Sequence, residues 1–132
     1  MAAVGSVDIE VELIGWLQTQ LGPDVVVRDE LDNNLLGELP TVQVERAAGD
    51  DDGFRLDRAL FDANVYAATR SEAAALSATV RGLLLAQLRG SSATNAVFGM
   101  VRTVAAPGWR PYEDLNLRRY GATYEVFFHP VS

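Results

Sequence analysis

The stretch from Leu56 to Arg89 most constrains the fold, because a strand pattern passes almost directly into a helix pattern. Apolar and polar residues alternate through Leu56–Ala67, as they do in a strand that is buried on one face. The predicted buried face holds Ala59, Phe61, Ala63 and Val65, while Arg58, Asp62 and Asn64 fall mostly on the other face. Such a strand needs a second layer to cover its apolar side.

The segment Thr69–Arg89 supplies that layer as a predicted helix. Thr69 and Glu72 have the spacing of a capping box, in which the threonine side chain accepts a hydrogen bond from the third helical amide. Gly90 follows where a left-handed residue ends a helix. One apolar stripe runs along the segment, formed by Leu76, Val80, Leu83, Leu84 and Leu88. The helix is therefore expected to pack across a sheet.

The remaining elements are predicted from the same two periodicities. Ser6–Leu21 reads as a helix ended by Gly22-Pro23, although Val7–Leu13 also alternates as a strand would. Residues 29–39 are expected to form a loop with one helical turn, and Ala47–Phe54 a hairpin tip or flexible loop. Further strands are predicted at Val25–Arg28, Thr41–Arg46, Ala96–Ala105 and Tyr120–Phe128.

This order predicts one α+β domain spanning residues 1–132. Its mostly antiparallel sheet of about four to five strands would carry two main helices on one face. In Ala96–Ala105 we expect Phe98, Met100 and Val104 on one face and Val97 and Val101 on the other. In Tyr120–Phe128 the alternation predicts one shared face for Tyr120, Ala122, Tyr124, Val126 and Phe128.

The composition excludes several kinds of site. The chain has no cysteine and one histidine, which excludes disulfides, thiolate metal sites and multi-histidine metal sites within one chain. We see neither a signal peptide nor an apolar run of about 20 residues, and we expect the chain in the host cytoplasm or in a particle assembled there. The net charge of −7 would repel DNA. Its basic residues are all arginine, which fits either a protein interface or a GC-rich genome.

No constellation of catalytic residues is evident, so we do not expect an enzyme or a cofactor. The sequence contains no nucleophile-elbow, P-loop or dinucleotide-binding motif. Glu113 and Asp114 are adjacent and would rarely face each other across a substrate, as a pair of catalytic carboxylates must. His129 has no serine or cysteine partner motif and is interpreted as an incidental residue at a strand end.

Two segments are candidate protein interfaces. The loop at Asp50, Asp51 and Asp52 is interpreted first as a solvated tip, with a protein contact as the alternative, because the spacing of a calcium loop is absent. The second candidate is the aromatic turn formed by Trp109, Arg110, Pro111 and Tyr112, together with Arg118 and Arg119.

Two interpretations of the second segment stay open. Its two prolines restrict the backbone, which favours a surface shaped for a partner. Alternatively, Trp109 and Tyr112 cap the sheet edge and the arginines pair with Glu113 and Asp114.

The order of these segments resembles the tail terminator proteins of long-tailed, lambda-like bacteriophages, in particular those of actinobacterial phages. The resemblance rests on four stretches that together cover most of the chain, and no single motif is diagnostic. These stretches are Val11–Pro23, Leu39–Arg46 (LPTVQVER), Leu56–Leu84 and Trp109–Val126 (WRPYEDLNLRRYGATYEV).

The resemblance implies a structural virion protein. Six copies would form a ring that caps the tail tube, ends tube polymerisation and meets the connector or head completion protein, with DNA passing through the lumen. The protein would then sit at the head-proximal end of the tail. Either Val25–Arg28 or Leu56–Ala67 could pair between neighbouring copies. Gly49–Gly53 and Trp109–Arg119 would contact tube or connector. If Arg118 and Arg119 meet acidic groups across the subunit boundary, Arg119→Glu would disrupt the ring and leave a folded monomer.

Two other functions stay open on the sequence. Another head-to-tail joining protein would share the size, the acidity and the ring symmetry. An α+β dimer that binds a small ligand would instead need a pocket with convergent polar groups.

Overall fold

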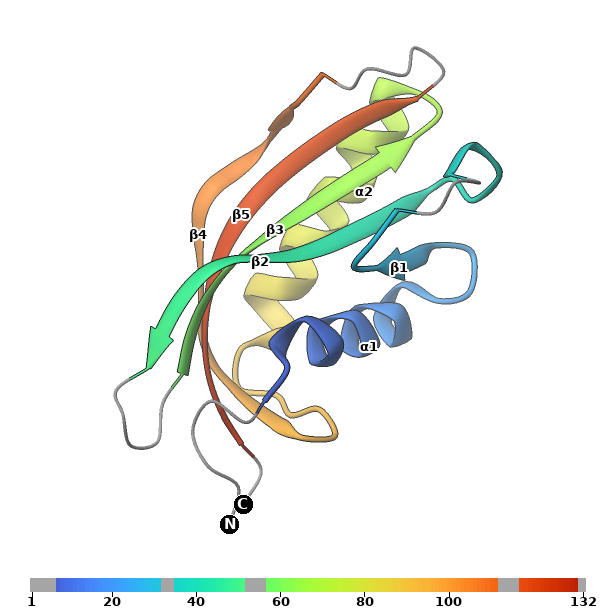
Figure 1. Ribbon diagram of the computed structural model, residues 1–132. Helices are drawn as coiled ribbons and strands as arrows, with labels where there is room; N and C mark the ends of the chain where they lie inside the picture. Colours follow the sequence, from blue (N-terminus) through green and yellow to red (C-terminus); the bar gives the residue numbers. More distant parts are fainter. Residues whose placement is uncertain (1–6, 32–34, 52–56, 112–116, 131–132) are drawn as a thin grey trace.

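A computed structural model describes residues 7–31, 35–51, 57–111 and 117–130, except for the side chains of residues 48–51. The chain forms an α+β fold in which two helices pack on a five-stranded, mostly antiparallel sheet (Figure 1). The sheet order is β1-β2-β3-β5-β4, with β1 parallel to β2 and every other pair antiparallel. The helices are α1 (Ile9–Leu21) and α2 (Arg70–Leu83), and the strands are β1 (Val26–Arg28), β2 (Thr41–Asp51), β3 (Asp57–Ala67), β4 (Ala96–Trp109) and β5 (Arg118–Pro130).

The predicted strand-to-helix unit is confirmed. The side chain of Thr69 accepts a hydrogen bond from the Glu72 amide (3.2 Å) and begins α2. Gly90 has a positive φ of 80° and follows the helical segment. The last predicted turn differs, because Leu84–Leu88 forms a short π-helix, η2, in place of α-helix.

One core lies between the helices and one face of the sheet. The register aligns Val44 with Ala63 and Ala63 with Ala122, so the apolar positions of neighbouring strands share a face. Leu13 and Leu17 of α1 reach the same core, and Trp16 packs against it while partly exposed. The predicted apolar face of β5 is confirmed as well, since Ala122, Tyr124, Val126 and Phe128 are buried and Tyr120 is partly buried.

The prediction of a loop at Ala47–Phe54 was wrong over its first half, because β2 continues as a strand to Asp51. A bulge between Arg46 and Ala48 absorbs one extra residue, and pairing with β3 then resumes at Ala48↔Leu60. The ladder hydrogen bonds outweigh the low strand propensity of glycine and aspartate here. Asp52 lies outside the described residues.

The predicted alternation of buried and exposed residues along β4 was wrong. Met100 and Val104 are 47% and 52% exposed, whereas Val101 is buried with Phe98. Three register shifts between Phe98 and Gly108 break the period of two. The strand also runs on to Trp109 through Pro107, which is tolerated because β4 is an edge strand.

The sheet ends with β1 on one side and with β4 on the other. β1 is an edge strand, as predicted for Val25–Arg28. β3 lies in the middle of the sheet and is bonded to β2 on one side and β5 on the other. The prediction that this strand could pair with a neighbouring copy is therefore wrong. β4 is the second edge strand of the described sheet, and its first residues are hydrogen-bonded to the preceding segment Gly90–Ala93.

Candidate interaction surfaces

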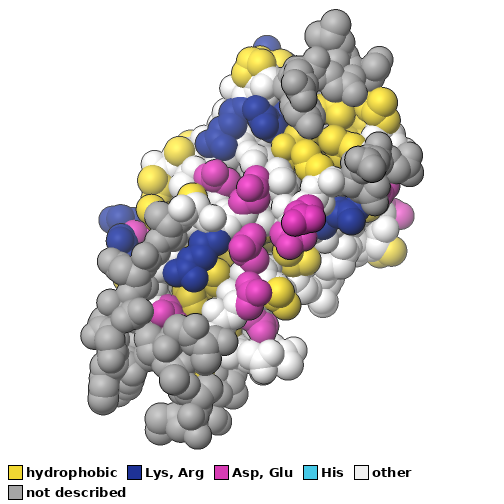
Figure 2. Space-filling view, viewed as in Figure 1, with side chains coloured by type: hydrophobic (Ala, Val, Ile, Leu, Met, Phe, Trp, Pro, Cys, Tyr) yellow, Lys and Arg dark blue, Asp and Glu magenta, His cyan; other side chains and the backbone are white. Residues whose placement is uncertain are grey.

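The face of the sheet opposite the helices is polar, with several of its polar side chains buried. Gln43 is 8% exposed and accepts a hydrogen bond at 3.0 Å from the hydroxyl of Tyr66. Thr123 donates to Asp62 on the neighbouring strand (2.5 Å). Figure 2 shows acidic side chains gathered in the middle of the view, with arginines on either side.

The buried carboxylate of Glu125 lies in the middle of this polar face of the sheet. Glu125 of β5 is 3% exposed and pairs with Arg58 at 2.7 Å and with Arg102 at 3.1 Å. The two arginines come from β3 and β4, the strands on either side of β5. A buried charge without partners would destabilise the fold, so this clamp is what allows Glu125 to be buried.

Trp109 and Arg110 are held at one end of the sheet. The guanidinium of Arg70 lies 4.9 Å from the centre of the Trp109 ring, which packs edge-on against Tyr120. Arg110 crosses Gly121 and donates a hydrogen bond to Asn64 (3.2 Å). A Cβ at Gly121 would lie 2.5 Å from the Asn64 side-chain oxygen and would clash with Arg110, so glycine fits this crossing best.

Arg118 and Arg119 lie at the start of β5, beside Trp109 and Arg110. Arg119 donates to the main-chain oxygens of Arg110 (3.3 Å) and Pro111 (3.0 Å), and Arg118 to that of Leu117 (3.1 Å). The two arginines therefore hold the end of the β4–β5 hairpin. The other predicted members, Tyr112, Glu113 and Asp114, lie outside the described residues, and the prediction for Arg119→Glu stays a prediction.

The two predicted interfaces lie at opposite ends of the sheet. Asp51 pairs with Asp57 at the start of β3, and Arg118 pairs with Ala67 at its end. Asp50 lies one position before Asp51 in β2, opposite Arg58. The 11 residues of β3 separate the two ends by about 33 Å at 3.3 Å per residue. Figure 1 shows the end of β2 and the start of β5 far apart along the strands.

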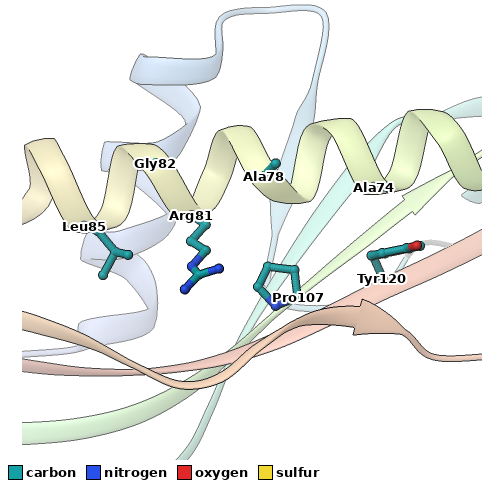
Figure 3. Close-up of a pocket in the computed structure, with 7 residues that line it drawn as sticks. All are labelled: Ala74, Ala78, Arg81, Gly82, Leu85, Pro107 and Tyr120. Atoms are coloured by element: carbon teal, nitrogen blue, oxygen red, sulfur yellow. The ribbon is translucent and has the colours of Figure 1, made fainter.

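A groove that the sequence did not predict lies between α2 and the second half of β4. Its volume is about 480 Å³, and its lining is mostly small and apolar. Arg81 extends from α2 toward the strands, between Leu85 and Pro107 (Figure 3). The other lining residues are Ala74, Ala78, Gly82 and Tyr120.

Three polar side chains in or near this groove, those of Arg81, Thr103 and Tyr124, lack hydrogen-bond partners within the described residues, whereas the Tyr120 hydroxyl accepts a hydrogen bond from Arg70 (3.4 Å). Arg81 forms neither a hydrogen bond nor an ion pair there. The hydroxyls of Tyr124 and Thr103 are buried without a partner and lie on residues that face each other across β5 and β4. Burial raises the pKa of Tyr124 to about 12, and the nearby positive charge of Arg81 partly offsets this rise.

Other sites are not evident in the described part of the chain. It holds no cluster of three or more metal-ligating side chains. The Nδ1 of His129 lies 3.0 Å from the Pro130 oxygen. Neither α1 nor α2 has the length and apolar character to cross a membrane. Searches against protein-family descriptions and curated proteins find no match for this chain.

Proposed function

We propose that this protein is a structural ring protein of a phage tail, which caps the tail tube and joins it to the head connector. One observation carries the proposal: the two predicted contact segments lie at opposite ends of the long strands, and the described sheet ends in an edge strand on each side. A protein that joins two partners in a ring needs two end surfaces and two lateral surfaces. The resemblance to tail terminators in the order of the segments is the second support.

The two lateral surfaces differ, which favours a head-to-tail ring over a two-fold dimer. β1 is a three-residue edge next to α1, whereas β4 is a 14-residue edge next to α2. Contacts between unlike surfaces generate closed rings when the rotation closes. Six copies is the number that the resemblance implies.

The net charge suits a passage for DNA. Each copy carries −7, so a ring holds a large excess of negative charge. DNA binding depends on Lys and Arg contacts to phosphates, and an acidic lumen would form few of them. DNA would therefore pass through without sequence-specific binding.

The alternative of a ligand-binding dimer has less support. A binding pocket requires several polar groups that converge on one ligand. The lining of the groove between α2 and β4 offers one charged side chain, that of Arg81, and the hydroxyl of Tyr120. Its remaining lining is apolar or glycine.

The test is the length of tail tubes in the presence and absence of the protein. A phage with a disrupted copy of this gene should make tubes of uncontrolled length, and added purified protein should restore the normal length. Tubes of normal length that fail to join heads would instead identify a connector or head completion protein. Particles with normal tails and full infectivity would refute the proposal.

A further inference from the structure

The groove between α2 and β4 has the features of an unfilled interface. Arg81 is partly buried against the apolar lining and has neither a hydrogen bond nor an ion pair among the described residues. The hydroxyls of Tyr124 and Thr103 are buried nearby without partners. A guanidinium donates hydrogen bonds and accepts none, so the group missing beside Arg81 is an acceptor.

Local backbone structure opens this groove. The α2 side of the groove holds Ala74, Ala78 and Gly82, which are spaced by four residues and leave room above β4. Leu85 lies in the π-helical turn, a distortion that is frequent at functional sites. The bulges of β4 bring Pro107 into the opposite wall.

The neighbouring edge is also apolar and free. β4 ends the sheet, and its Val104, Ala105 and Ala106 are all exposed. A free edge with exposed apolar residues favours association with another chain. Because the bulges interrupt the ladder, side-chain docking in the groove is favoured over a long continuation of the sheet.

The opposite edge of the same chain has the complementary charge. Asp24, Asp29 and Glu30 flank β1, are exposed, and form no ion pair with any described residue. By contrast, the segment 70–89 that borders β4 carries three arginines and one glutamate. A carboxylate is the acceptor that an arginine guanidinium binds most strongly.

We propose that the groove between α2 and β4 receives the acidic β1 edge of a second copy, with Arg81 paired to a carboxylate of Asp24, Asp29 or Glu30. This inference deepens the proposed ring, because it names the surfaces that meet between subunits. The contact itself can be tested on the protein alone.

Disulfide trapping tests the contact cleanly, because the chain contains no cysteine. A chain carrying Ala78→Cys is mixed with a chain carrying Asp24→Cys or Asp29→Cys, and the mixed disulfide is followed under mild oxidation. The matched control is Ala75→Cys, an exposed residue of α2 outside the groove lining. We expect the Ala78 variant to cross-link at least about tenfold faster than the control with one of the two partners. Adding Arg81→Glu to the Ala78 chain should remove that difference.

Equal rates for the Ala78 and Ala75 variants would overturn the inference, as would a fast reaction that Arg81→Glu leaves unchanged. Charge exchange provides the second measurement. Arg81→Glu should weaken self-association in sedimentation, and a second substitution, Asp24→Arg, Asp29→Arg or Glu30→Arg, should restore it. Failure of all three to restore it would also overturn the inference.

These results are distinguishable from failure of the proposed function. If the protein forms a ring on tails but the cross-link does not form, the proposed function is supported and the proposed contact is refuted. If the cross-link forms but no ring is found on particles, the proposed contact is supported and the proposed function is refuted.

Discussion

The hydroxyl of Tyr124 gives the most direct test of the packing described here. Tyr124 is fully buried, its ring lies 5.7 Å from that of Phe61, and its oxygen has no hydrogen-bond partner in the described residues. Burying a hydroxyl without a partner costs roughly 1–3 kcal/mol in mutational data. Tyr124→Phe keeps the ring and removes the oxygen, so it should raise the free energy of unfolding by about that amount at pH 7.

The matched control is Tyr66→Phe, which should have the opposite sign. Tyr66 is also buried, and its hydroxyl donates to Gln43 at 3.0 Å. Removing this donor leaves a buried amide oxygen without that hydrogen bond, which should lower the free energy of unfolding by about 1 kcal/mol or more. Urea denaturation of the two variants and the parent protein measures both differences.

The pH dependence adds a second test of Tyr124. Its pKa is about 12 in the folded state against 10.0 for an ordinary tyrosine, so above pH 10 the hydroxyl ionises first in the unfolded chain. The folded state therefore loses stability between pH 10 and 12, by roughly 2–3 kcal/mol, because each pKa unit corresponds to about 1.4 kcal/mol. Tyr124→Phe removes this loss, so its advantage over the parent protein should widen across that range.

Two results would refute this reasoning. A Tyr124→Phe variant that is less stable than the parent by about 1 kcal/mol would show that the hydroxyl is hydrogen-bonded in the native state. A stability difference that stays constant from pH 9 to 12 would show that Tyr124 ionises equally readily in both states.

Two further predictions concern the polar face of the sheet. Gly121→Ala should displace Arg110 from Asn64 and lower the free energy of unfolding by about 1–3 kcal/mol, measured by urea denaturation; an unchanged midpoint would show that the crossing contributes nothing. Glu125→Gln should lower it by roughly 1–3 kcal/mol, because the buried carboxylate loses its charge while Arg58 keeps its own; a stable variant would show that the clamp is dispensable.

Much of the fold could be predicted because the local signals agreed with the tertiary structure. Alternation in β3 and β5 marked the buried face correctly, since both strands lie inside the sheet with one covered face. Thr69 and Gly90 marked the limits of the second helical segment, because capping depends on a few neighbouring residues.

β4 and the end of β2 could not be predicted, because their conformation depends on their partners. The period of two fails in β4 at three register shifts, which become visible once β5 is in place. The strand at Ala47–Asp51 exists because β3 pairs with it, despite residues that disfavour strands.

The candidate site was predicted in part. Trp109, Arg110, Arg118 and Arg119 do gather at one end of the sheet, but their contacts within the chain hold the β4–β5 hairpin and fasten it to Arg70 and Asn64. Arg81 was missed because it lies beside the apolar stripe of a helix, where an arginine ordinarily extends into solvent. The groove that holds Arg81 depends on the bulges of β4, which bring Pro107 into its wall.

Electron microscopy of native particles, with this chain labelled, tests the central claim most directly. A sixfold ring of the protein at the head-proximal end of the tail tube is the result that our account predicts. In that ring, one end of the long strands should contact the tail tube and the other end should contact the connector. Absence of the protein from every particle, together with a discrete two-fold dimer in solution, would contradict the account.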